Sequence, residues 1–375
     1  MSVTRHIPLA RPLLGEREEE LVLQVLRSGD LSRGPLVPAF QRAFAERVGA
    51  RFAIACSSGT SGLHAAVHRL GLGPGDEVIT SSLSFVASAN VIRYTGATPV
   101  FAEIDERTFN IDPAAVEAAI TPRTRAILPV HIFGYPCDID GVNRVAAAHG
   151  LPVVEDACEA LGAETGGVQV GRHGNPAVFA FYPNKQMTTG EGGIITTDDP
   201  EIAAELESLV DQGRGDDGDW LHHVRVGFNY RMDEMSAAVG IAQLEKLDEL
   251  LEGRRRVADR YERLLADIDG VELPYRGEGQ RSWFVYVVRL APGIDRAAVM
   301  AALRERGVAT RGYLPAIHLQ PCYRELGHRP GELPVTERVA ASTLALPFFV
   351  QLGEDDQEHV ARSLREVLAE LQGGA

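Results

Sequence analysis

RFAIACSSGTSGLHAAVHRLG, residues 51–71, places one strand directly before one helix. The run RFAIACSS predicts the strand, and TSGLHAAVHRLG predicts a helix that ends at Gly71. The same alternation continues to about residue 197, which favours a mostly parallel sheet covered by helices on both faces. The further strands expected are 75–81, 98–104, 125–130, 151–156, 177–182 and 192–197, with helices at 84–96, 112–120 and 138–150.

Outside this stretch the pattern predicts a second, smaller α/β unit. Two helices come before the first strand, and a long, amphipathic helical region at 233–268 follows the last one. We therefore expect an α/β fold with a large domain at 1–250 and a small C-terminal domain at 251–375. The elements expected outside the sheet are helices at 15–27, 36–48, 295–307 and 355–372 and strands at 283–290 and 308–313.

The composition excludes several classes of function. Of the 375 residues 45% are hydrophobic and 24% charged, and the net charge of −15 makes nucleic acid an unfavourable partner. No apolar run reaches the length of a membrane span, and the N-terminus lacks the apolar core of a signal peptide, so a cytoplasmic location is expected. The four cysteines are scattered and predict neither a metal site nor disulfides.

Lysine is nearly absent from this sequence. Of the 37 basic residues only Lys185 and Lys246 are lysines. A lysine can lose its proton and attack a carbonyl carbon, whereas arginine cannot. Lys246 lies in a charged helical stretch and is expected at the surface, whereas Lys185 follows a predicted strand in the polar turn NKQMTTGEGG. Lys185 is therefore the candidate nucleophile, with a solvated surface charge as the alternative.

Two further segments supply groups that suit the same chemistry. The strand at 51–58 passes into its helix through Ser58-Gly59-Thr60-Ser61, where backbone N–H groups favour a phosphate, although such residues also serve simply as helix caps. Asp156 ends the strand 151–156, at the edge where ligands of α/β sheets bind. A reactive lysine, an acid for a ring nitrogen and a phosphate cup are what pyridoxal 5′-phosphate requires.

The whole chain resembles the DegT-type sugar aminotransferases, which are pyridoxal-phosphate enzymes with the aspartate-aminotransferase fold (fold type I). Several segments in the right order are more specific than any one motif. They are IPLARPLLGEREEELVLQVLRSG (7–29), SSGTSGLH (57–64), PGDEVITSSLSFVASAN (74–90), VEDACEALGA (154–163), FYPNKQMTTGEGG (181–193), GFNYRMDEMSAA (227–238) and IHLQPCYRELG (317–327).

The resemblance implies a set of cofactor-binding residues. Lys185 matches the lysine that bonds to the cofactor and later moves the proton, and Asp156 matches the acid paired with the pyridinium nitrogen. Thr60 and Ser61, next to Gly59, match the phosphate-binding pair. Two more matches are Phe85, which would stack on the ring, and Glu159, which would lie near the ring hydroxyl.

The resemblance also implies a homodimer with shared active sites. Asn229 resembles the residue that reaches the cofactor phosphate of the neighbouring subunit, and Arg231 lies beside it as a possible substrate contact. Aromatic residues, Met and Arg in this segment are types enriched at interfaces. The residues implied for the sugar-nucleotide site are Tyr313, His318 and Gln320.

At two positions the chain departs from the common pattern of the family. Ala180 replaces a serine that many members use as a phosphate ligand, so that contact is lost or supplied elsewhere. Glu159 replaces a glutamine, and perosamine-synthase-like members share this glutamate. The second departure favours a 4-keto-6-deoxy sugar nucleotide as the substrate.

The expected function is transfer of an amino group, from L-glutamate, to a keto carbon of a nucleotide-linked deoxysugar in deoxyaminosugar biosynthesis. One alternative is a pyridoxal-phosphate-dependent sugar dehydratase, in which histidine replaces the lysine; Lys185 argues against it. A second alternative is a catalytically silent, regulatory homologue, against which the intact Lys185, Asp156 and Thr60 argue.

Overall fold

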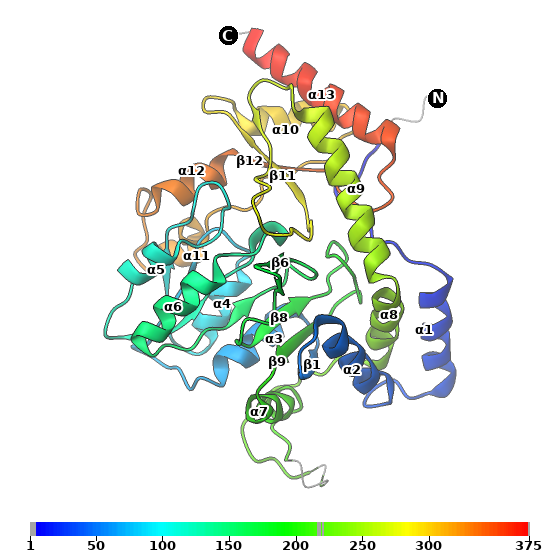
Figure 1. The fold of residues 1–375 in the computed structure, drawn as a ribbon, viewed down its shortest axis with the longest axis vertical. Helices are drawn as coiled ribbons and strands as arrows, with labels where there is room; N and C mark the ends of the chain where they lie inside the picture. Colours follow the sequence, from blue (N-terminus) through cyan, green and yellow to red (C-terminus); the bar gives the residue numbers. More distant parts are fainter. Residues whose placement is uncertain (1–4, 216–218, 220, 374–375) are drawn as a thin grey trace.

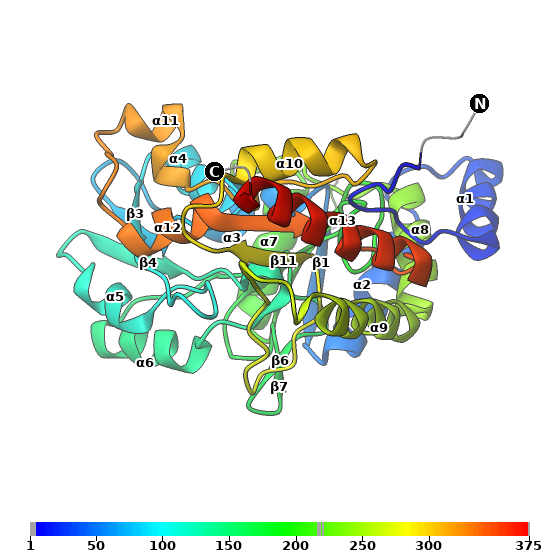
Figure 2. The same cartoon turned by 90° about the horizontal axis from the view of Figure 1, so that it is seen from above.

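The computed structural model describes residues 5–215, 219 and 221–373. Figure 1 shows a large sheet with its helices in the lower part of the molecule and a smaller sheet above it. The long helix α9 (Leu247–Leu265) runs along one side from the lower to the upper part. Figure 2, seen from above, shows α13 (Glu354–Gly373) lying between α10 (Arg296–Glu305) and α9.

The large sheet follows from the strand–helix alternation. Its strand order is β3-β2-β4-β5-β8-β9-β1, where single parallel pairs, Ile127 with Val153 and Val130 with Asp156, join β4 to β5. All neighbouring strands are parallel except β9, which is antiparallel to both of its neighbours, so the predicted mostly parallel sheet is confirmed. The strands are β1 Phe52–Cys56, β2 Glu77–Ser81, β3 Thr98–Ala102, β4 Thr124–Leu128, β5 Glu155–Asp156, β8 Ala177–Ala180 and β9 Gly193–Thr197.

The reversed direction of β9 has a local cause. The chain passes from β8 to β9 through the loop 181–192 without a crossover helix, and a direct connection of this kind joins antiparallel strands. The loop is closed at its base because Phe181 and Gly192 pair through a 2.9 Å backbone hydrogen bond. The Phe181 ring packs edge-on against Phe40 and Phe44, each 5.6 Å away. The loop that carries Lys185 therefore starts from a rigid, buried anchor.

Alternate residues of the strands fill two cores. Ile54, Val178 and Ile195 face one core, which contains residues of α3 and α7, whereas Ala53 and Phe179 face the other, which contains residues of α2 and α8. Buried apolar surface on both faces is what a near-continuous apolar strand requires. The helices are α1 Glu16–Ser28, α2 Leu36–Val48, α3 Gly59–His68, α4 Ala87–Tyr94, α5 Pro113–Ala118, α6 Ile139–His149, α7 Pro200–Val210 and α8 Glu234–Glu245, with the 3-10 turn Ile132–Gly134.

The C-terminal part is built on an antiparallel sheet of order β10-β11-β12. The strand predicted at 308–313 is absent; Val308 pairs with Ile7 and Arg311 with Ala345, so no single partner strand extends along the segment. Ile7 is also buried in the core of this part, and the division at residue 250 stays a prediction. The elements here are β10 Val271–Glu272, β11 Tyr286–Leu290, β12 Thr343–Leu346, α10 Arg296–Glu305, α11 Pro321–Arg324, α12 Pro334–Ser342 and the 3-10 turn Ile317–Leu319, besides the separate hairpin β6 Glu164–Thr165 and β7 Val168–Gln169.

The predicted helical region at 233–268 is two helices that meet at Lys246. Lys246 was expected at the surface, but its Nζ lies 2.6 Å from Glu18 Oε1 and its side chain is mostly buried. An acid as buried as Glu18 requires a partner, which explains why this lysine is drawn inward.

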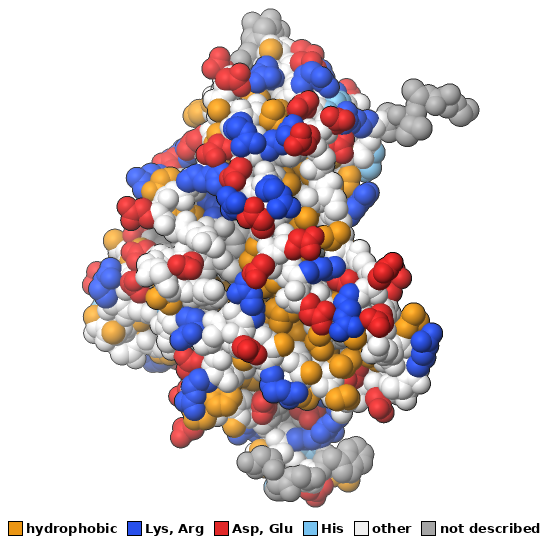
Figure 3. Space-filling model, turned by 45° about the vertical axis from the view of Figure 1, so that its right-hand side comes forward, with side chains coloured by type: hydrophobic (Ala, Val, Ile, Leu, Met, Phe, Trp, Pro, Cys, Tyr) orange, Lys and Arg blue, Asp and Glu red, His pale blue; other side chains and the backbone are white. Residues whose placement is uncertain are grey.

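The outer surface is charged, and basic and acidic side chains are intermixed on it. Figure 3, which turns the side carrying α1, α8 and α9 toward the viewer, shows blue and red side chains together around a hydrophobic area. Ion pairs such as Arg255 with Glu252 on α9 account for part of this mixture. Among the described residues, no helix is long and apolar enough to span a bilayer.

Candidate active site

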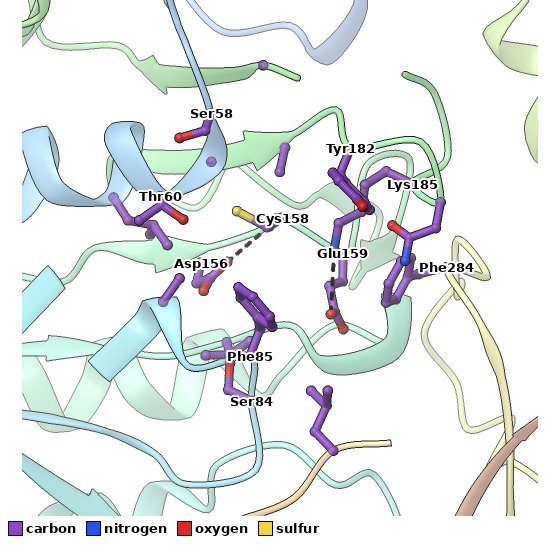
Figure 4. Close-up of a pocket in the computed structure, with 18 of the residues that line it drawn as sticks. Ser58, Thr60, Ser84, Phe85, Asp156, Cys158, Glu159, Tyr182, Lys185 and Phe284 are labelled. Atoms are coloured by element: carbon purple, nitrogen blue, oxygen red, sulfur yellow. Dashed lines mark hydrogen bonds and ion pairs between the residues drawn. The ribbon is translucent and has the colours of Figure 1, made fainter. Parts of the chain in front are cut away.

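A cavity of about 480 Å³ opens where the strands of the large sheet reach their carboxyl ends. Ligands of open α/β sheets bind at this edge because the loops that leave it can carry chemically varied residues. Figure 4 shows the cavity with side chains converging on it from several loops. Its walls include Ser58, Gly59, Thr60, Ser84, Phe85, Asp156, Cys158, Glu159, Ala180, Tyr182, Asn184, Lys185, Phe284 and Tyr313.

One end of the cavity is formed by the N-terminus of α3. The helix begins with a capping box, in which Ser58 Oγ accepts the Ser61 N–H at 3.0 Å and Ser61 Oγ accepts the Ser58 N–H at 2.9 Å. Thr60 lines the cavity, whereas the Ser61 hydroxyl is occupied by the cap and is absent from the cavity wall. The first turn of a helix presents N–H groups and a positive dipole end, so this end of the cavity suits an anion.

Gly59 and Ala180 allow α3 to approach β8 closely. A Cβ atom placed on Gly59 would lie 2.6 Å from Ala180 Cβ and 2.8 Å from Cys158 Sγ, both shorter than real contacts. Small residues at these positions therefore bring the helix N-terminus to the strand ends. Ala180 lines the cavity where the family resemblance led us to expect a serine hydroxyl.

Asp156 is a buried carboxylate that is held on both oxygens. Its Oδ2 accepts the Ser88 hydroxyl at 2.7 Å, and its Oδ1 accepts the backbone N–H of Cys158 at 3.1 Å. Ser88 in turn lies 2.8 Å from the hydroxyl of Ser84, which lines the cavity. These contacts fix the direction of a negative charge that faces the cavity.

Lys185 lies on the opposite side of the cavity, in the β8–β9 loop. Its backbone N–H donates to the Tyr182 carbonyl at 2.9 Å, which turns the chain, and its Nζ lies 3.6 Å from Glu159 Oε1. The same Nζ lies 3.9 Å from the centre of the Phe284 ring, at cation–π distance. Figure 4 shows the Lys185 side chain pointing into the cavity toward Glu159. The amine is therefore aimed at whatever fills the cavity.

Glu159 is a buried acid between Lys185 and the backbone. Burial raises the pKa of Glu159, and the Asp156 charge adds to this, while the Lys185 ammonium and the Phe133 N–H lower it without cancelling the rise. The Phe133 N–H donates to Glu159 Oε2 at 2.8 Å. The cavity thus combines two acids, one amine and an anion-binding helix end.

Phe85 contributes an aromatic face. Its side chain is 60% exposed in the single chain, although Phe is among the residues that are usually buried. Figure 4 shows the ring reaching into the cavity between Asp156 and Glu159. An exposed ring in this place offers a flat apolar surface to a bound molecule.

The profile of the DegT/DnrJ/EryC1/StrS aminotransferase family matches residues 12–365. The chain belongs to this family. The resemblance noted from sequence segments is thereby confirmed.

Two relatives are similar to the chain along nearly their whole length. The chain is 42% identical to the GDP-perosamine synthase of Caulobacter vibrioides, covering 98% of this chain and 100% of that protein. It is 38% identical to the spore coat polysaccharide biosynthesis protein SpsC of Bacillus subtilis, covering 96% and 97%.

A solved structure of the family confirms the fold class. The crystal structure of S. venezuelae DesV, in complex with a ketimine intermediate, superposes with a TM-score of 0.90 at 35% identity, covering 97% of this chain and 98% of that one. The aspartate-aminotransferase-like α/β fold predicted from the sequence is therefore correct.

Not every residue singled out from the family resemblance lines the cavity. Gly59, Thr60, Phe85, Asp156, Glu159, Lys185 and Tyr313 do. His318 is buried elsewhere, with Nδ1 2.7 Å from the Ser82 hydroxyl and Nε2 3.1 Å from Glu337. Gln320 occupies the N-cap position of the short helix α11 without a side-chain capping bond, and it is not part of the cavity wall.

Asn229 and Arg231 also lie away from the cavity of their own chain. Asn229 is exposed, next to Asp211 in a short antiparallel pair, and Arg231 donates to Asp211 Oδ1 at 2.8 Å. Their roles in the site of a neighbouring subunit stay predictions.

The sequence reasoning missed several residues of the wall. Ser84 lines the wall next to Phe85, and its i,i+4 spacing from Ser88, which lies outside the wall, was a signal that one hydroxyl could support the other. Tyr182 and Asn184 are close neighbours of Lys185 in sequence and could have been expected. Phe284 gave no such signal, because only the fold brings it beneath the Lys185 amine.

Proposed function

We propose that this family member uses pyridoxal 5′-phosphate to transfer an amino group from L-glutamate to a keto carbon of a nucleotide-linked deoxysugar. The observation that carries the proposal is the placement of Lys185 and Asp156 in one cavity that also contains the N-terminus of α3. An amine, a buried carboxylate and an anion-binding helix end match the aldehyde, the ring nitrogen and the phosphate of this cofactor.

The residues present fit the cofactor group by group. Gly59 and Thr60 would hold the phosphate, Phe85 would cover one face of the ring, and Asp156 would pair with its nitrogen. Because the wall carries Ala180 in place of a serine hydroxyl, the backbone N–H groups of α3 would take a larger share of the phosphate. When bound, the cofactor supplies an electron sink for charge that develops on the substrate carbon.

Residues of the chain itself would hold a charge beside the ring nitrogen and move the proton at the substrate carbon. Asp156 keeps a negative charge in place, through Ser88 and the Cys158 N–H, and so favours a protonated ring nitrogen. The Lys185 amine, once free, can accept and return a proton at the substrate carbon. Glu159 Oε1 lies 3.6 Å from Lys185 Nζ, so this acid would hold the amine in position between accepting the proton and returning it.

The relatives and Glu159 support a 4-keto-6-deoxyhexose as the sugar. A GDP-perosamine synthase is 42% identical over nearly the whole chain. Tyr313 lines the cavity and accepts a 3.4 Å hydrogen bond from Asn184, which places its ring where the sugar would enter. Burial raises the pKa of Tyr313 to about 12, so its hydroxyl stays neutral and can donate.

A homodimer would complete each site. Asn229 is exposed, and the loop before it presents Leu221, Val224 and Val226, which are 65%, 53% and 84% exposed. Apolar side chains this exposed favour burial against another surface. A second copy of this chain would cover them and bring Asn229 to the neighbouring cofactor.

The test uses the purified protein loaded with pyridoxal 5′-phosphate. L-Glutamate alone should bleach the yellow cofactor and release 2-oxoglutarate, and a panel of keto-sugar nucleotides should then give an amino sugar detectable by mass. A protein that does not take up the cofactor, or that takes it up but yields no amino sugar with any member of the panel, would contradict the proposal.

A further inference from the structure

Arg254 of α9 carries a buried positive charge beside the Lys185 loop. Its side chain is 4% exposed, and no carboxylate among the described residues forms an ion pair with it. Instead Nη2 donates to the carbonyls of Lys185 at 2.5 Å and Asn184 at 3.3 Å. Nη1 donates to the carbonyls of Phe284 at 3.1 Å and Trp283 at 3.4 Å. One guanidinium thus joins two segments that are far apart in sequence.

Burying the Arg254 charge is energetically unfavourable for a contact that has only a structural role. Taking a charge out of water is unfavourable unless a partner compensates it, and replacement of buried charges by apolar side chains of similar volume often causes no loss of stability. Burial lowers the pKa of Arg254 to about 10, which leaves the group charged at neutral pH. Four carbonyl oxygens accept from its two Nη atoms and the Phe348 ring lies 5.7 Å away, whereas the buried Nε has no hydrogen-bond partner among the described residues.

The two segments that Arg254 joins are those that flank the Lys185 amine. Arg254 holds the backbone of Lys185 itself, and it holds Phe284, whose ring lies 3.9 Å from Lys185 Nζ. A second link of the loop is independent of Arg254, because Gln186 Nε2 donates to Ser282 Oγ at 2.8 Å. The loop therefore has a second link to the 282–284 segment, whereas Arg254 bonds to the carbonyls of Lys185 and Phe284 themselves.

We propose that Arg254 is a positioning residue for Lys185, whose two-pronged donor group locks the Lys185 backbone to the Phe284 segment and so aims the amine into the cavity. The inference rests on the proposed function, since it assigns Arg254 to the step in which Lys185 reacts. With the cofactor bound, the Lys185 amine would condense with its aldehyde, with the aldehyde oxygen leaving as water, and Arg254 would hold the amine in place for that condensation.

The test separates covalent capture from binding. Wild type and Arg254→Met, both freed of cofactor, are mixed with pyridoxal 5′-phosphate, and capture at Lys185 is timed by absorbance and located by borohydride reduction and peptide mass. Affinity for pyridoxamine 5′-phosphate, which has no aldehyde, is measured alongside. Capture should slow about 10- to 100-fold, because small misplacements of a reacting group cost rates of this order. Affinity for the amine form should stay within about twofold, since α3 and Asp156 are untouched.

Two further variants complete the experiment. Arg255→Met alters the next residue of α9, which is exposed and paired with Glu252, and should capture the cofactor at the wild-type rate. Arg254→Lys keeps the positive charge but lacks the two Nη donors of the guanidinium, so it should recover part of the capture rate. If Arg254→Met does not fold, the capture rate of Arg254→Lys is compared with that of wild type instead.

Several results would overturn the inference. Wild-type capture rates in both Arg254 variants would do so, and so would an equal loss of capture and of affinity for the amine form, which marks a general structural defect. A wild-type protein that never captures the aldehyde would instead refute the proposed function, and the inference with it.

Discussion

Two donors hold the Asp156 carboxyl group in a fixed orientation beside the cavity. Ser88 and the Cys158 N–H satisfy its two oxygens, and the side chain is buried. An amide in its place would keep most of the shape and remove the charge that favours a protonated ring nitrogen.

We therefore expect Asp156→Asn to lower kcat by at least about 100-fold, which corresponds to about 3 kcal/mol of lost transition-state stabilisation. Cofactor capture at Lys185 should persist, as borohydride trapping can verify. Asp267→Asn, a change at an exposed residue, serves as the control. A loss of less than about tenfold would assign the acid to another residue.

Glu159 gives a prediction for the pH dependence of stability. Its pKa is raised in the folded protein, chiefly by burial, so the folded state holds its proton more tightly than the unfolded state. Wild type should therefore lose stability relative to Glu159→Gln as the pH rises from about the unfolded pKa of 4.5 through the raised value.

Urea unfolding of both cofactor-free proteins, from about pH 4 to about pH 8, measures this difference. A difference that stays constant, or that grows in favour of wild type as the pH rises, would show that the ion pair with Lys185 outweighs burial.

At the scale of elements, the approach of α3 to β8 decides whether an anion site exists. Gly59→Ala would put a methyl group 2.6 Å from Ala180 Cβ, and relief requires the helix end to move. Overpacking of this kind costs about 1–3 kcal/mol, and the same movement should weaken the affinity for pyridoxamine 5′-phosphate.

Gly73→Ala is the matched control, because the added methyl group would meet nothing within 4 Å. Thermal unfolding and cofactor titration of both variants provide the check. Equal unfolding temperatures and equal cofactor affinities of the two variants would show that the close approach of α3 to β8 is unimportant for stability and for cofactor binding.

The strands and helices also show which features of the fold sequence patterns can predict. The alternation of apolar runs with helices predicted the large sheet and its mostly parallel order, because each strand buries both faces. The segment 308–313 looked like a strand because of its β-branched residues, yet each end pairs with a different partner, which no local pattern records.

The site residues show the same limit: those near strand ends could be placed from the sequence, whereas those brought in by long-range packing could not. Asp156 could be predicted because it ends a strand of the sheet, and Lys185 because it lies in the loop that follows one, whereas Glu159 was implied by the family resemblance. Phe284 and Arg254 could not, since long-range packing alone brings them to Lys185. Lys246 was misplaced because its partner, Glu18, lies on another helix.

For the whole molecule the main prediction is a homodimer whose sites draw on both chains. Lys185→Ala and Asn229→Ala, each inactive or strongly impaired alone, should regain activity when unfolded and refolded together. Random pairing gives one intact site in each mixed dimer, so about a quarter of wild-type activity should return.

Lys185→Ala mixed with Asp156→Asn is the control, because both residues line the cavity of one chain and no intact site can form. Confirmed mixed dimers of Lys185→Ala and Asn229→Ala that stay as inactive as this control would restrict each site to a single chain.

We expect Lys185 to mediate the transfer of an amino nitrogen to a sugar. The most direct measurement supplies L-glutamate labelled with heavy nitrogen and a 4-keto-6-deoxy sugar nucleotide, and follows the label by mass. Wild type and Lys246→Arg, which alters the other lysine of the chain, should place the heavy nitrogen in the sugar, whereas Lys185→Arg should place none there. Labelled amino sugar formed by Lys185→Arg at the wild-type rate would show that Lys185 is not required for the transfer.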